Sequence, residues 1–435
     1  MSPTSVNTHG TPTTPPNSTI ASSAPLKPPA SKQSVDYELV QLTDQQVIDF
    51  TRVQNSQSWK GALSTQDYVL REHVLGKAQM TADKLLVFML KSKDDDATPL
   101  CSIELLIRPA WKYENIDGSC KRRQVLSGCI GGVYTYEDHR GNGYARIMVD
   151  HLVQFAKRND VLGTDGFVFL YSEIGEYYTK NGFKSFAVDL IKIKIKTTEP
   201  APVDPQVATS KDDHFELVEY HQFQHLMELY AAKLDADITK QVQSDNKSRV
   251  ALVPNSDIID WFHLRAKYVT YKLFPPPHSP NIDFTSGSYN EIREQLQHSH
   301  PKTFGIKLTT TTTSTESLAG FIIWTIDWSS PTSNKATVIK LVSLHDDTQV
   351  LQKLLDHMVA HIAATKIEGQ STSEIVIWES EVCGPVKLYL EERYGAVTGA
   401  ENGSRSAALM CDVSEDDKLR RGQLVWEENS KLCWF

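Results

Sequence analysis

The sequence predicts an α/β protein with a central mixed sheet flanked by helices, followed by a second α/β unit. Runs rich in β-branched and aromatic residues alternate with segments whose apolar residues recur at helical spacing. The chain has 435 residues, which is too long for one ordinary domain. The order strand, strand, helix, strand, helix also occurs twice. We therefore expect two units, the second a diverged structural repeat of the first.

The first unit is expected to span residues 37–196. Strands are predicted at 37–42, 85–90, 99–107, 127–136, 167–171 and 185–195. A polar helix is expected between about 43 and 71, and an amphipathic helix begins near Gly143, after the fourth strand. A short helix after the fifth strand is expected to end at Gly182, because glycine readily adopts the left-handed conformation of a helix C-cap.

The remaining segments differ in composition. Residues 1–36 are rich in Pro, Ser and Thr and have few large apolar side chains, so a disordered tail is expected. This tail has neither the hydrophobic run of a signal peptide nor the arginines of a transit peptide. Residues 197–213 have the composition of a linker. The second unit is expected to span 214–435, with strands at 320–328, 336–344 and 374–380 and helices from about 348 and 386.

Composition excludes several classes of function. The net charge of −9 argues against a nucleic-acid partner, which usually needs a basic surface. No apolar run has the length of a membrane span, so no membrane partner is expected. Six cysteines without a C-x-x-C pair are typical of reduced thiols in a cytoplasmic protein. His139 and His151 lack the spacing of metal ligands, so no metal is expected. The sequence predicts no particular oligomeric state.

The segment with the clearest chemistry is His-Arg-Gly-Asn-Gly-Tyr-Ala, residues 139–145, between a predicted strand and a predicted helix. Gly141 and Gly143 let the backbone approach a ligand closely. The helix start offers unpaired N–H groups and the positive end of the helix dipole. With the cation of Arg140, these features suit a pyrophosphate. The alternative is a tight turn without a ligand, because the fingerprints of dinucleotide-binding and P-loop proteins are incomplete here.

A second segment, Tyr-Tyr-Thr-Lys-Asn-Gly-Phe at residues 177–183, follows the next predicted strand. Residues 140–145 resemble the Arg/Gln-x-x-Gly-x-Gly/Ala loop of the GCN5-related N-acetyltransferases, the GNAT superfamily. Residues 177–183 are similar to the Phe-Tyr-x-Lys-x-Gly-Phe segment of the same superfamily. The resemblance covers roughly residues 40–196. The layout also resembles the fungal lysine N6-acetyltransferases of lysine catabolism, which share the Ser-Glu-Ile-Gly-Glu-Tyr-Tyr stretch at 172–178 and an appended C-terminal domain.

This resemblance implies an N-acetyltransferase fold and activity, with acetyl-CoA as co-substrate. The residues implied in pyrophosphate binding are Arg140, Gly141, Asn142, Gly143, Tyr144 and Ala145. The strand edge at Val133, Tyr134 and Thr135 would pair with pantetheine, and one of its N–H groups would act as an oxyanion donor. Tyr178 matches the family tyrosine that protonates the departing thiolate of CoA after direct attack by a neutral amine.

The general base has three candidates. Many relatives use a carboxylate on the central strands, which points to Glu104, Glu137 or Glu173. Glu104 lies in an apolar stretch, where an acid is unusual, and Glu137 stands where many relatives have proline. For each of the three, a solvated or salt-bridged surface acid is the alternative interpretation.

The second unit has no equivalent of the acetyl-CoA loop, because residues 344–347 read Leu-His-Asp-Asp. We expect it to cover the substrate side of the first unit and to offer Glu379 or Glu381 to a small cationic amine. The closer resemblance implies that this amine is N6 of free L-lysine, in lysine degradation. The alternatives are another amine (a polyamine, another amino acid or a protein lysine) or a non-enzymatic protein that binds acetyl-CoA.

Overall fold

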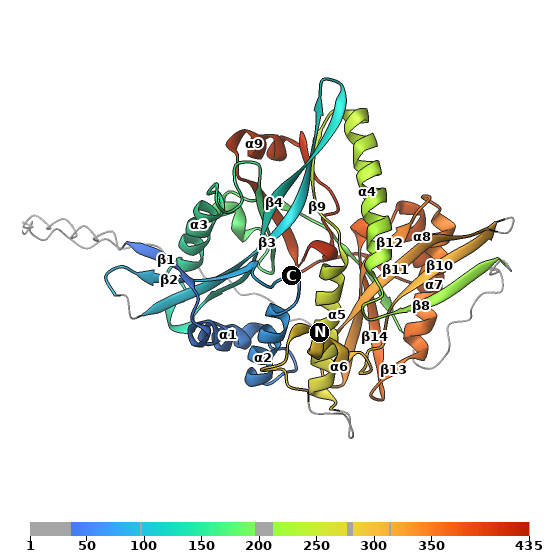
Figure 1. Cartoon of the computed structure of the whole chain (residues 1–435), viewed down its shortest axis with the longest axis horizontal. Coiled ribbons are helices and arrows are strands. Elements are labelled where there is room, and N and C mark those ends of the chain that lie inside the picture. Colours follow the sequence, from blue (N-terminus) through green and yellow to red (C-terminus); the bar gives the residue numbers. More distant parts are fainter. Residues whose placement is uncertain (1–35, 96–97, 196–211, 276–281, 313–314, 435) are drawn as a thin grey trace, which may run out of the picture.

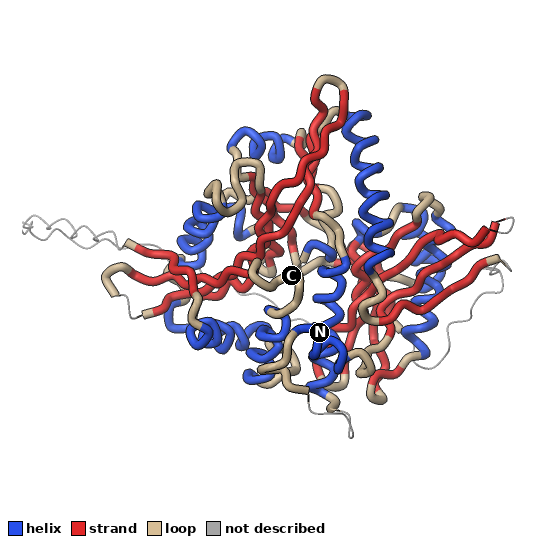
Figure 2. The backbone as a smooth tube through the Cα atoms, viewed as in Figure 1, coloured by secondary structure: helices blue, strands red, loops and turns tan. Residues whose placement is uncertain are grey.

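The computed structural model describes residues 36–95, 98–195, 212–275, 282–312 and 315–434. The expected tail at 1–36 and linker at 197–213 lie almost entirely outside these ranges. Two twisted sheets lie side by side, and α5 and the C-terminal end of the chain lie between them (Figures 1 and 2). No helix among the described residues has both the length and the apolar character needed to cross a membrane.

The first sheet has nine strands. In spatial order they are β1 (Tyr37–Leu42), β2 (Leu85–Ser92), β3 (Pro99–Ile116), β4 (Ser119–Thr135), β5 (Phe167–Ser172), β16 (Arg405–Met410) and β6 (Lys184–Phe186), with β9 (Ser248–Leu252) on β3 and β17 (Leu424–Trp426) on β9. The second sheet runs β15 (Val397–Ala400), β7 (Leu190–Lys194), β14 (Gln370–Trp378), β12 (Ser333–Ser343), β11 (Thr315–Ser330), β10 (Thr303–Thr312) and β8 (Asp213–Glu219), with β13 (Lys366–Ile367) on β14.

Helices fill the space around the sheets. The α-helices are α1 (Gln45–Trp59), α2 (Thr65–Gly76), α3 (Tyr144–Ala156), α4 (Gln224–Asp245), α5 (Ser256–Leu273), α6 (Tyr289–Leu296), α7 (Thr348–Ala364), α8 (Gly384–Tyr394) and α9 (Val413–Arg421). Single 3₁₀ turns are η1 (Glu137–His139), η2 (Tyr177–Asn181), η3 (Glu379–Glu381) and η4 (Lys431–Cys433). The polar helix expected near 43–71 is two helices, because Ser64 starts α2 by accepting a hydrogen bond from the backbone N–H of Asp67.

The two halves repeat one supersecondary unit, as the sequence predicted. β4 and β5 are parallel and connected through α3, and β12 and β14 are parallel and connected through α7. In each half, the first strand of the parallel pair is also the second strand of an antiparallel hairpin, which is β3–β4 in one half and β11–β12 in the other. The β3–β4 hairpin is longer than expected and closes at Asp117 and Gly118, both with positive φ. An Asp-Gly pair between two strands is a typical hairpin signal, so this extension was predictable.

Each sheet contains strands from the other half of the chain: the first sheet holds β9, β16 and β17, and the second holds β7. β16 lies between β5 and β6, and β7 lies between β14 and β15, always antiparallel to its neighbours. The expectation of a single strand at 185–195 is therefore wrong, because β6 and β7 belong to different sheets. Ile191 and Ile193 of β7 are fully buried in the core of the second sheet, which holds the strand there. The two sheets thus do not follow the expected boundaries at 37–196 and 214–435.

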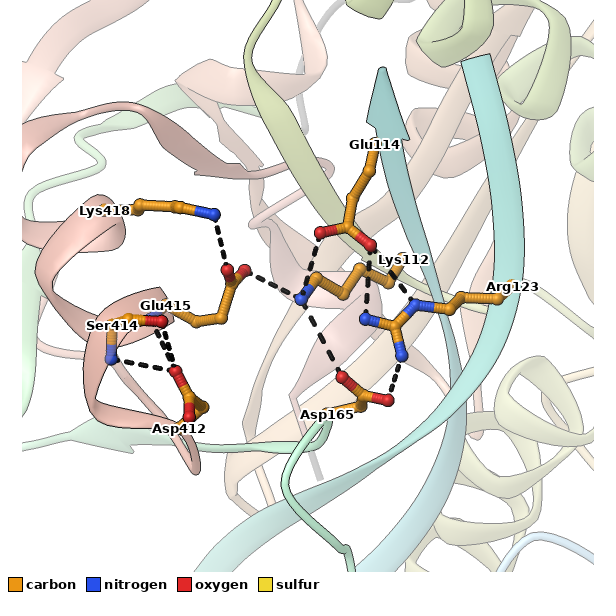
Figure 3. Close-up of polar contacts among 8 residues, drawn as sticks. All are labelled: Lys112, Glu114, Arg123, Asp165, Asp412, Ser414, Glu415 and Lys418. Atoms are coloured by element: carbon orange, nitrogen blue, oxygen red, sulfur yellow. Dashed lines mark hydrogen bonds and ion pairs between the residues drawn. The ribbon is translucent and has the colours of Figure 1, made fainter. Parts of the chain in front are cut away.

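The C-terminal region is attached to the first sheet by a buried charge network as well as by β16 (Figure 3). The ammonium of Lys112 on β3 is buried and lies 2.7 Å from a carboxylate oxygen of Glu415 on α9 and 3.4 Å from one of Glu114. Arg123 on β4 pairs with Glu114 and Asp165 at the more exposed edge. Although burial acts to raise it, hydrogen bonds from Lys112 and Lys418 hold the pKa of Glu415 below its usual value.

Candidate active site

The strands β4 and β5 separate at the centre of the first sheet. Their parallel ladder runs from Ser127 and Phe167 to Ile130 and Leu170 and ends there. β4 continues beyond this point up to Thr135, and among the described strands it pairs there only with β3. The register between β3 and β4 shifts near Gly132, whose φ is +57°. This bulge leaves a backbone edge at residues 131–135, including Val133, Tyr134 and Thr135, beside a widening gap.

The predicted loop lies at the end of this edge. Arg140 donates hydrogen bonds to the hydroxyl of Tyr134 (2.7 Å) and the carbonyl of Thr135 (3.3 Å), which ties the loop to the strand. Asn142 donates to the carbonyls of His139 and Arg140. Gly143 is the N-cap of α3 with φ of +80°, and no side chain caps the helix. The N–H groups at Tyr144 and Ala145 therefore belong to an uncapped helix start.

This geometry fits a pyrophosphate followed by an extended pantetheine arm. A Cβ atom built on Gly141 or Gly143 meets no described atom within 4 Å, so the space in front of the loop is open. The uncapped start of α3 supplies N–H donors and the positive end of the helix dipole. The unpaired edge of β4 supplies backbone groups for an extended chain.

A cavity of about 260 Å³ adjoins the gap between β4 and β5 and has an unusual mixture of walls. Its acids are Glu72, Glu104 and Glu173, its cations are Arg71 and Arg265, and its aromatic residues are Trp59, Tyr68, Tyr171, Tyr178, Trp261 and Trp434. Val133 also contributes to the wall. This volume lies below the roughly 300–1,000 Å³ of pockets for drug-sized ligands and therefore suits a smaller molecule.

Glu104 is the buried acid of the cavity. It lies on β3 between β2 and β4, opposite Val87 and Gly131, and is 9% exposed. No hydrogen bond or ion pair joins its carboxylate to another residue in the described part of the chain, and burial raises its pKa to about 7. A Cβ on Gly132 would lie 3.2 Å from Cγ of Glu104, so a glycine leaves room for this side chain.

Tyr178, on η2, also lines the cavity. Its ring packs edge-on against Tyr177 and Phe183, and only 7% of the residue is exposed. Burial raises its pKa well above the usual value of a phenol, so the hydroxyl stays protonated at neutral pH. The side chain can therefore act as a proton donor inside the cavity.

The other two candidate bases occupy different positions. Glu173 lines the cavity and accepts a hydrogen bond from the indole of Trp59 at 3.2 Å. Glu137 is exposed on η1 and does not line the cavity. The structure therefore brings Glu104, Glu173 and Tyr178 to one cavity, with Val133 in its wall, and leaves Glu137 outside it.

The second half contributes different residues from those expected. Glu379 pairs with Lys387, and Glu381 is buried against Lys340, so neither lines the cavity. Instead, α5 supplies Trp261 and Arg265, and Trp434 comes from the C-terminal end of the chain. Trp261 and Arg265 are four residues apart and so share one face of a helix, but only the tertiary structure turns this face toward the cavity.

The start of α7 differs from the start of α3 although both follow a parallel strand. Asp347 caps α7 by accepting a hydrogen bond from the N–H of Gln349 at 2.8 Å. The negative charge of Asp347 therefore occupies the N-terminus of α7, whereas the N-terminus of α3 has no such side chain. The second repeat therefore lacks the anion-binding features of the first. No group of three or more potential metal ligands occurs among the described residues.

Comparison with known protein families agrees with both halves of this architecture. A family model described as "LYC1 GNAT-like C-terminal domain" matches residues 199–435, and one described as "Acetyltransferase (GNAT) family" matches residues 111–183. The chain belongs to the LYC1-like GNAT family. It is an N-acetyltransferase of the GNAT type, and GNAT enzymes use acetyl-CoA.

This LYC1-like chain is also similar to individual proteins. Uncharacterized protein YGR111W of Saccharomyces cerevisiae is 25% identical over 429 residues, covering 90% of this chain and 96% of the yeast protein. A lysine acetyltransferase of Yarrowia lipolytica is 30% identical over 161 residues, covering 33% of this chain and 40% of that protein. A solved structure from Enterococcus faecalis, described as a probable N-acyltransferase, shares the fold with a TM-score of 0.50 at 10% identity, covering 87% of this chain and 73% of that chain.

Proposed function

We propose that this protein transfers the acetyl group of acetyl-CoA to the N6 amine of free L-lysine, as a step in lysine degradation. The observation that carries the proposal is Glu104, an unpaired buried carboxylate in a small aromatic cavity beside the gap between β4 and β5. Such a group needs a cationic partner, and an alkylammonium supplies one. The six cysteines, all unpaired, support a cytoplasmic location.

Glu104 has the properties of the general base. A free lysine side chain has a pKa of about 10.4 and must lose a proton before its nitrogen can attack. Burial between aromatic walls lowers the pKa of a bound ammonium, while burial of Glu104 raises the pKa of its acid to about 7. The two effects bring donor and acceptor closer in proton affinity. Glu173, which also lines the cavity, is the second candidate for this role.

Tyr178 is proposed as the general acid, because its buried phenol retains its proton at neutral pH. Arg140, Gly141, Asn142, Gly143, Tyr144 and Ala145 would hold the pyrophosphate of acetyl-CoA, and the edge at Val133, Tyr134 and Thr135 would hold its pantetheine. The co-substrate supplies an activated thioester, so the protein needs no nucleophilic side chain. Cys129, whose burial raises its pKa to about 12, is not suited to be one.

Two further observations favour a free amino acid over a protein lysine. The cavity is small and has walls from both halves of the chain, so it suits a small molecule. The Yarrowia lipolytica relative carries the name lysine acetyltransferase, although the match covers 40% of its length.

The direct test is release of CoA thiol from acetyl-CoA by the purified protein with L-lysine, L-ornithine, spermidine and a histone-tail peptide. We expect L-lysine to give the highest kcat/KM, with mass spectrometry placing the acetyl group on N6. Turnover confined to spermidine or to the peptide would refute the proposed substrate while leaving the N-acetyltransferase assignment intact. Acetyl-CoA binding by calorimetry without turnover of any amine would favour a non-enzymatic acetyl-CoA-binding protein.

A further inference from the structure

The cavity contains a second charged group that lacks a partner. Arg265 lines the cavity from α5, and no hydrogen bond or ion pair joins its guanidinium to another residue in the described ranges. Its Cζ atom lies 5.2 Å from the ring centroid of Trp434 and 6.0 Å from that of Trp261. Aromatic faces attract a guanidinium but do not use its N–H donors, which stay available to a ligand in the cavity.

Arg71, the other cation of the cavity, differs from Arg265 because it already has an acidic partner. Its Nε and Nη2 atoms donate to one carboxylate oxygen of Glu72, at 2.8 and 2.5 Å, and its Cζ lies 4.5 Å from the ring centroid of Tyr68. The charge of Arg71 is therefore already balanced, whereas that of Arg265 is not. Burial and the nearby charge of Arg71 lower the pKa of Arg265, although the charges of Asp327 and Glu72 act to raise it, so this partly buried cation is only incompletely compensated by other residues.

Burying an unpaired charge is unfavourable unless a ligand completes the pair. The planar fork of a guanidinium matches a carboxylate, with which it forms two parallel hydrogen bonds. The same cavity holds the unpaired carboxylate of Glu104, which matches an ammonium. One unpaired carboxylate (Glu104) and one unpaired guanidinium (Arg265) therefore line a single small cavity. Together they are complementary to a zwitterion with an ammonium at one end and a carboxylate at the other.

We propose that Arg265 binds the α-carboxylate of an amino-acid substrate while the amine to be acetylated lies at Glu104. This inference rests on the proposed function, since it assigns the non-reacting end of the same substrate. Arg265 then determines specificity: it selects free amino acids over diamines and polyamines, whose second cation it repels, and over lysines within a protein, whose carboxyl group is an amide. The second half of the chain would thereby supply the substrate-recognition residue for a reaction carried out by the first.

The test compares L-lysine with L-lysinamide and cadaverine, which lack the carboxylate but keep the reacting amine. We expect the wild-type protein to prefer L-lysine over cadaverine by about 100-fold in kcat/KM, because loss of the ligand charge leaves Arg265 unpaired. In Arg265→Met this preference should fall to within about 3-fold, mainly through a higher KM for L-lysine. Arg265→Lys keeps the charge without the fork and should be intermediate.

The control is Arg158→Met, two residues beyond the last residue of α3, where the guanidinium is exposed and pairs with Asp160. This variant should keep the wild-type preference. Calorimetric binding of acetyl-CoA and thermal unfolding show whether each variant is folded. Equal wild-type activity with L-lysine and cadaverine, or an unchanged preference in folded Arg265→Met, would overturn the role of Arg265.

The same experiment separates the two proposals. If L-ornithine or another α-amino acid replaces L-lysine as substrate, and Arg265→Met still removes the preference for the carboxylate, the proposed substrate is wrong and Arg265 keeps its role. If no amine is acetylated, calorimetric titration of L-lysine into the CoA-bound protein decides. Binding that is lost in Arg265→Met and kept in Arg158→Met would support the carboxylate site, and the absence of binding to the wild-type protein would refute it.

Discussion

At the scale of single residues, the chemistry of this site depends on burial more than on residue type. Glu104, Glu137 and Glu173 are chemically alike, and all three remained open as candidates from the sequence, with Glu104 noted for its apolar surroundings. The structure places Glu104 on the central strand β3, where its carboxylate makes no hydrogen bond or ion pair with any described residue, and places Glu137 on the surface. Burial then raises the pKa of Glu104 to about 7, near the operating pH of an enzyme at neutrality.

For Glu104→Gln we expect kcat/KM for the amine to fall by roughly 100- to 1,000-fold, because the variant has no base at this position. In the wild-type protein the carboxyl group is protonated below about pH 7 and ionised above it, so log kcat/KM should rise with pH and level off above about 7. The pH–rate profile of the variant should lack this inflection. A profile that is unchanged in the variant would shift the role of base to Glu173.

The same shift predicts an effect on stability. The pKa of Glu104 in the folded protein, about 7, exceeds its ordinary value of 4.5, so ionisation opposes folding and stability is lost as the pH rises between these values. Glu104→Gln should therefore be more stable than the wild-type protein at pH 8, by on the order of 2–3 kcal/mol, with a much smaller difference at pH 4.5. Urea unfolding at both pH values measures this. A constant difference would contradict the raised pKa.

Tyr178→Phe removes the hydroxyl but preserves the ring contacts with Tyr177 and Phe183. We expect kcat to fall by roughly 100-fold while the Kd for acetyl-CoA, measured by calorimetry, changes little, because a general acid acts in the chemical step. A variant with normal kcat would show that another group protonates the leaving sulfur.

Residues contributed by distant parts of the chain were beyond sequence reasoning. Tyr178 could be named as the candidate general acid from the sequence, because the residues of its motif are neighbours in the chain. Arg265 and Trp434 reach the cavity from α5 and the C-terminal end, and nothing in their local sequence indicates this position. Glu379 and Glu381 were expected in their place, but these acids find partners in Lys387 and Lys340.

At the scale of elements, two helices with the same place in the repeat differ at their first turn. The loop before α3 was predictable, since two glycines between a strand and a helix permit positive φ and open space beside the backbone, and both are observed. The cap of α7 by Asp347 was also visible as an acid before an apolar periodic run. The break between α1 and α2 was not predicted although Ser64 is a local N-cap signal, and the separation of β6 from β7 was not predicted because it depends on tertiary packing.

Gly143→Asp should abolish measurable acetyl-CoA binding, because a carboxylate at the start of α3 repels a pyrophosphate and fills the open space. The substitution also strains a residue whose φ is +80°. Gly118→Asp is the matched control: Gly118 has φ of +78° and open surroundings but lies in the distant turn of the β3–β4 hairpin. Calorimetry should show normal acetyl-CoA binding for the control. Loss of binding in both variants would indicate strain, and retained binding in Gly143→Asp would refute the loop assignment.

At the scale of the whole molecule, the halves are joined by more than a surface contact. One hydrophobic core contains side chains from both, including Phe169 and Leu106 of the first half and Phe223, Phe262 and Ile339 of the second. The repeated strand–helix–strand unit was predictable from the pattern of elements. The reciprocal placement of β7 and β16 was not, because apolar periodicity does not identify the sheet that a strand joins.

Lys112→Met tests the attachment of α9 to the first sheet (Figure 3). The Lys112 side chain is 2% exposed, so its loss leaves Glu415 without its buried partner, and the free energy of unfolding should fall by about 3 kcal/mol at pH 7. Arg123→Met removes a side chain of the same network that is 41% exposed and should cost less than about 1 kcal/mol. Urea unfolding measures both. Equal effects would show that burial does not determine the strength of this network.

The position of β16 determines when the first sheet can be completed during synthesis of the chain. A ribosome completes β5 and β6 early, but the strand that lies between them, β16, is synthesised only after α8 and β15. Trp434, which lines the cavity, emerges later still. The catalytic half therefore cannot finish folding during its own synthesis, and its unpaired strand edges must be protected until the rest of the chain arrives. A messenger truncated anywhere before β16 would yield an incomplete first sheet, so the catalytic half depends on a strand that is synthesised long after it.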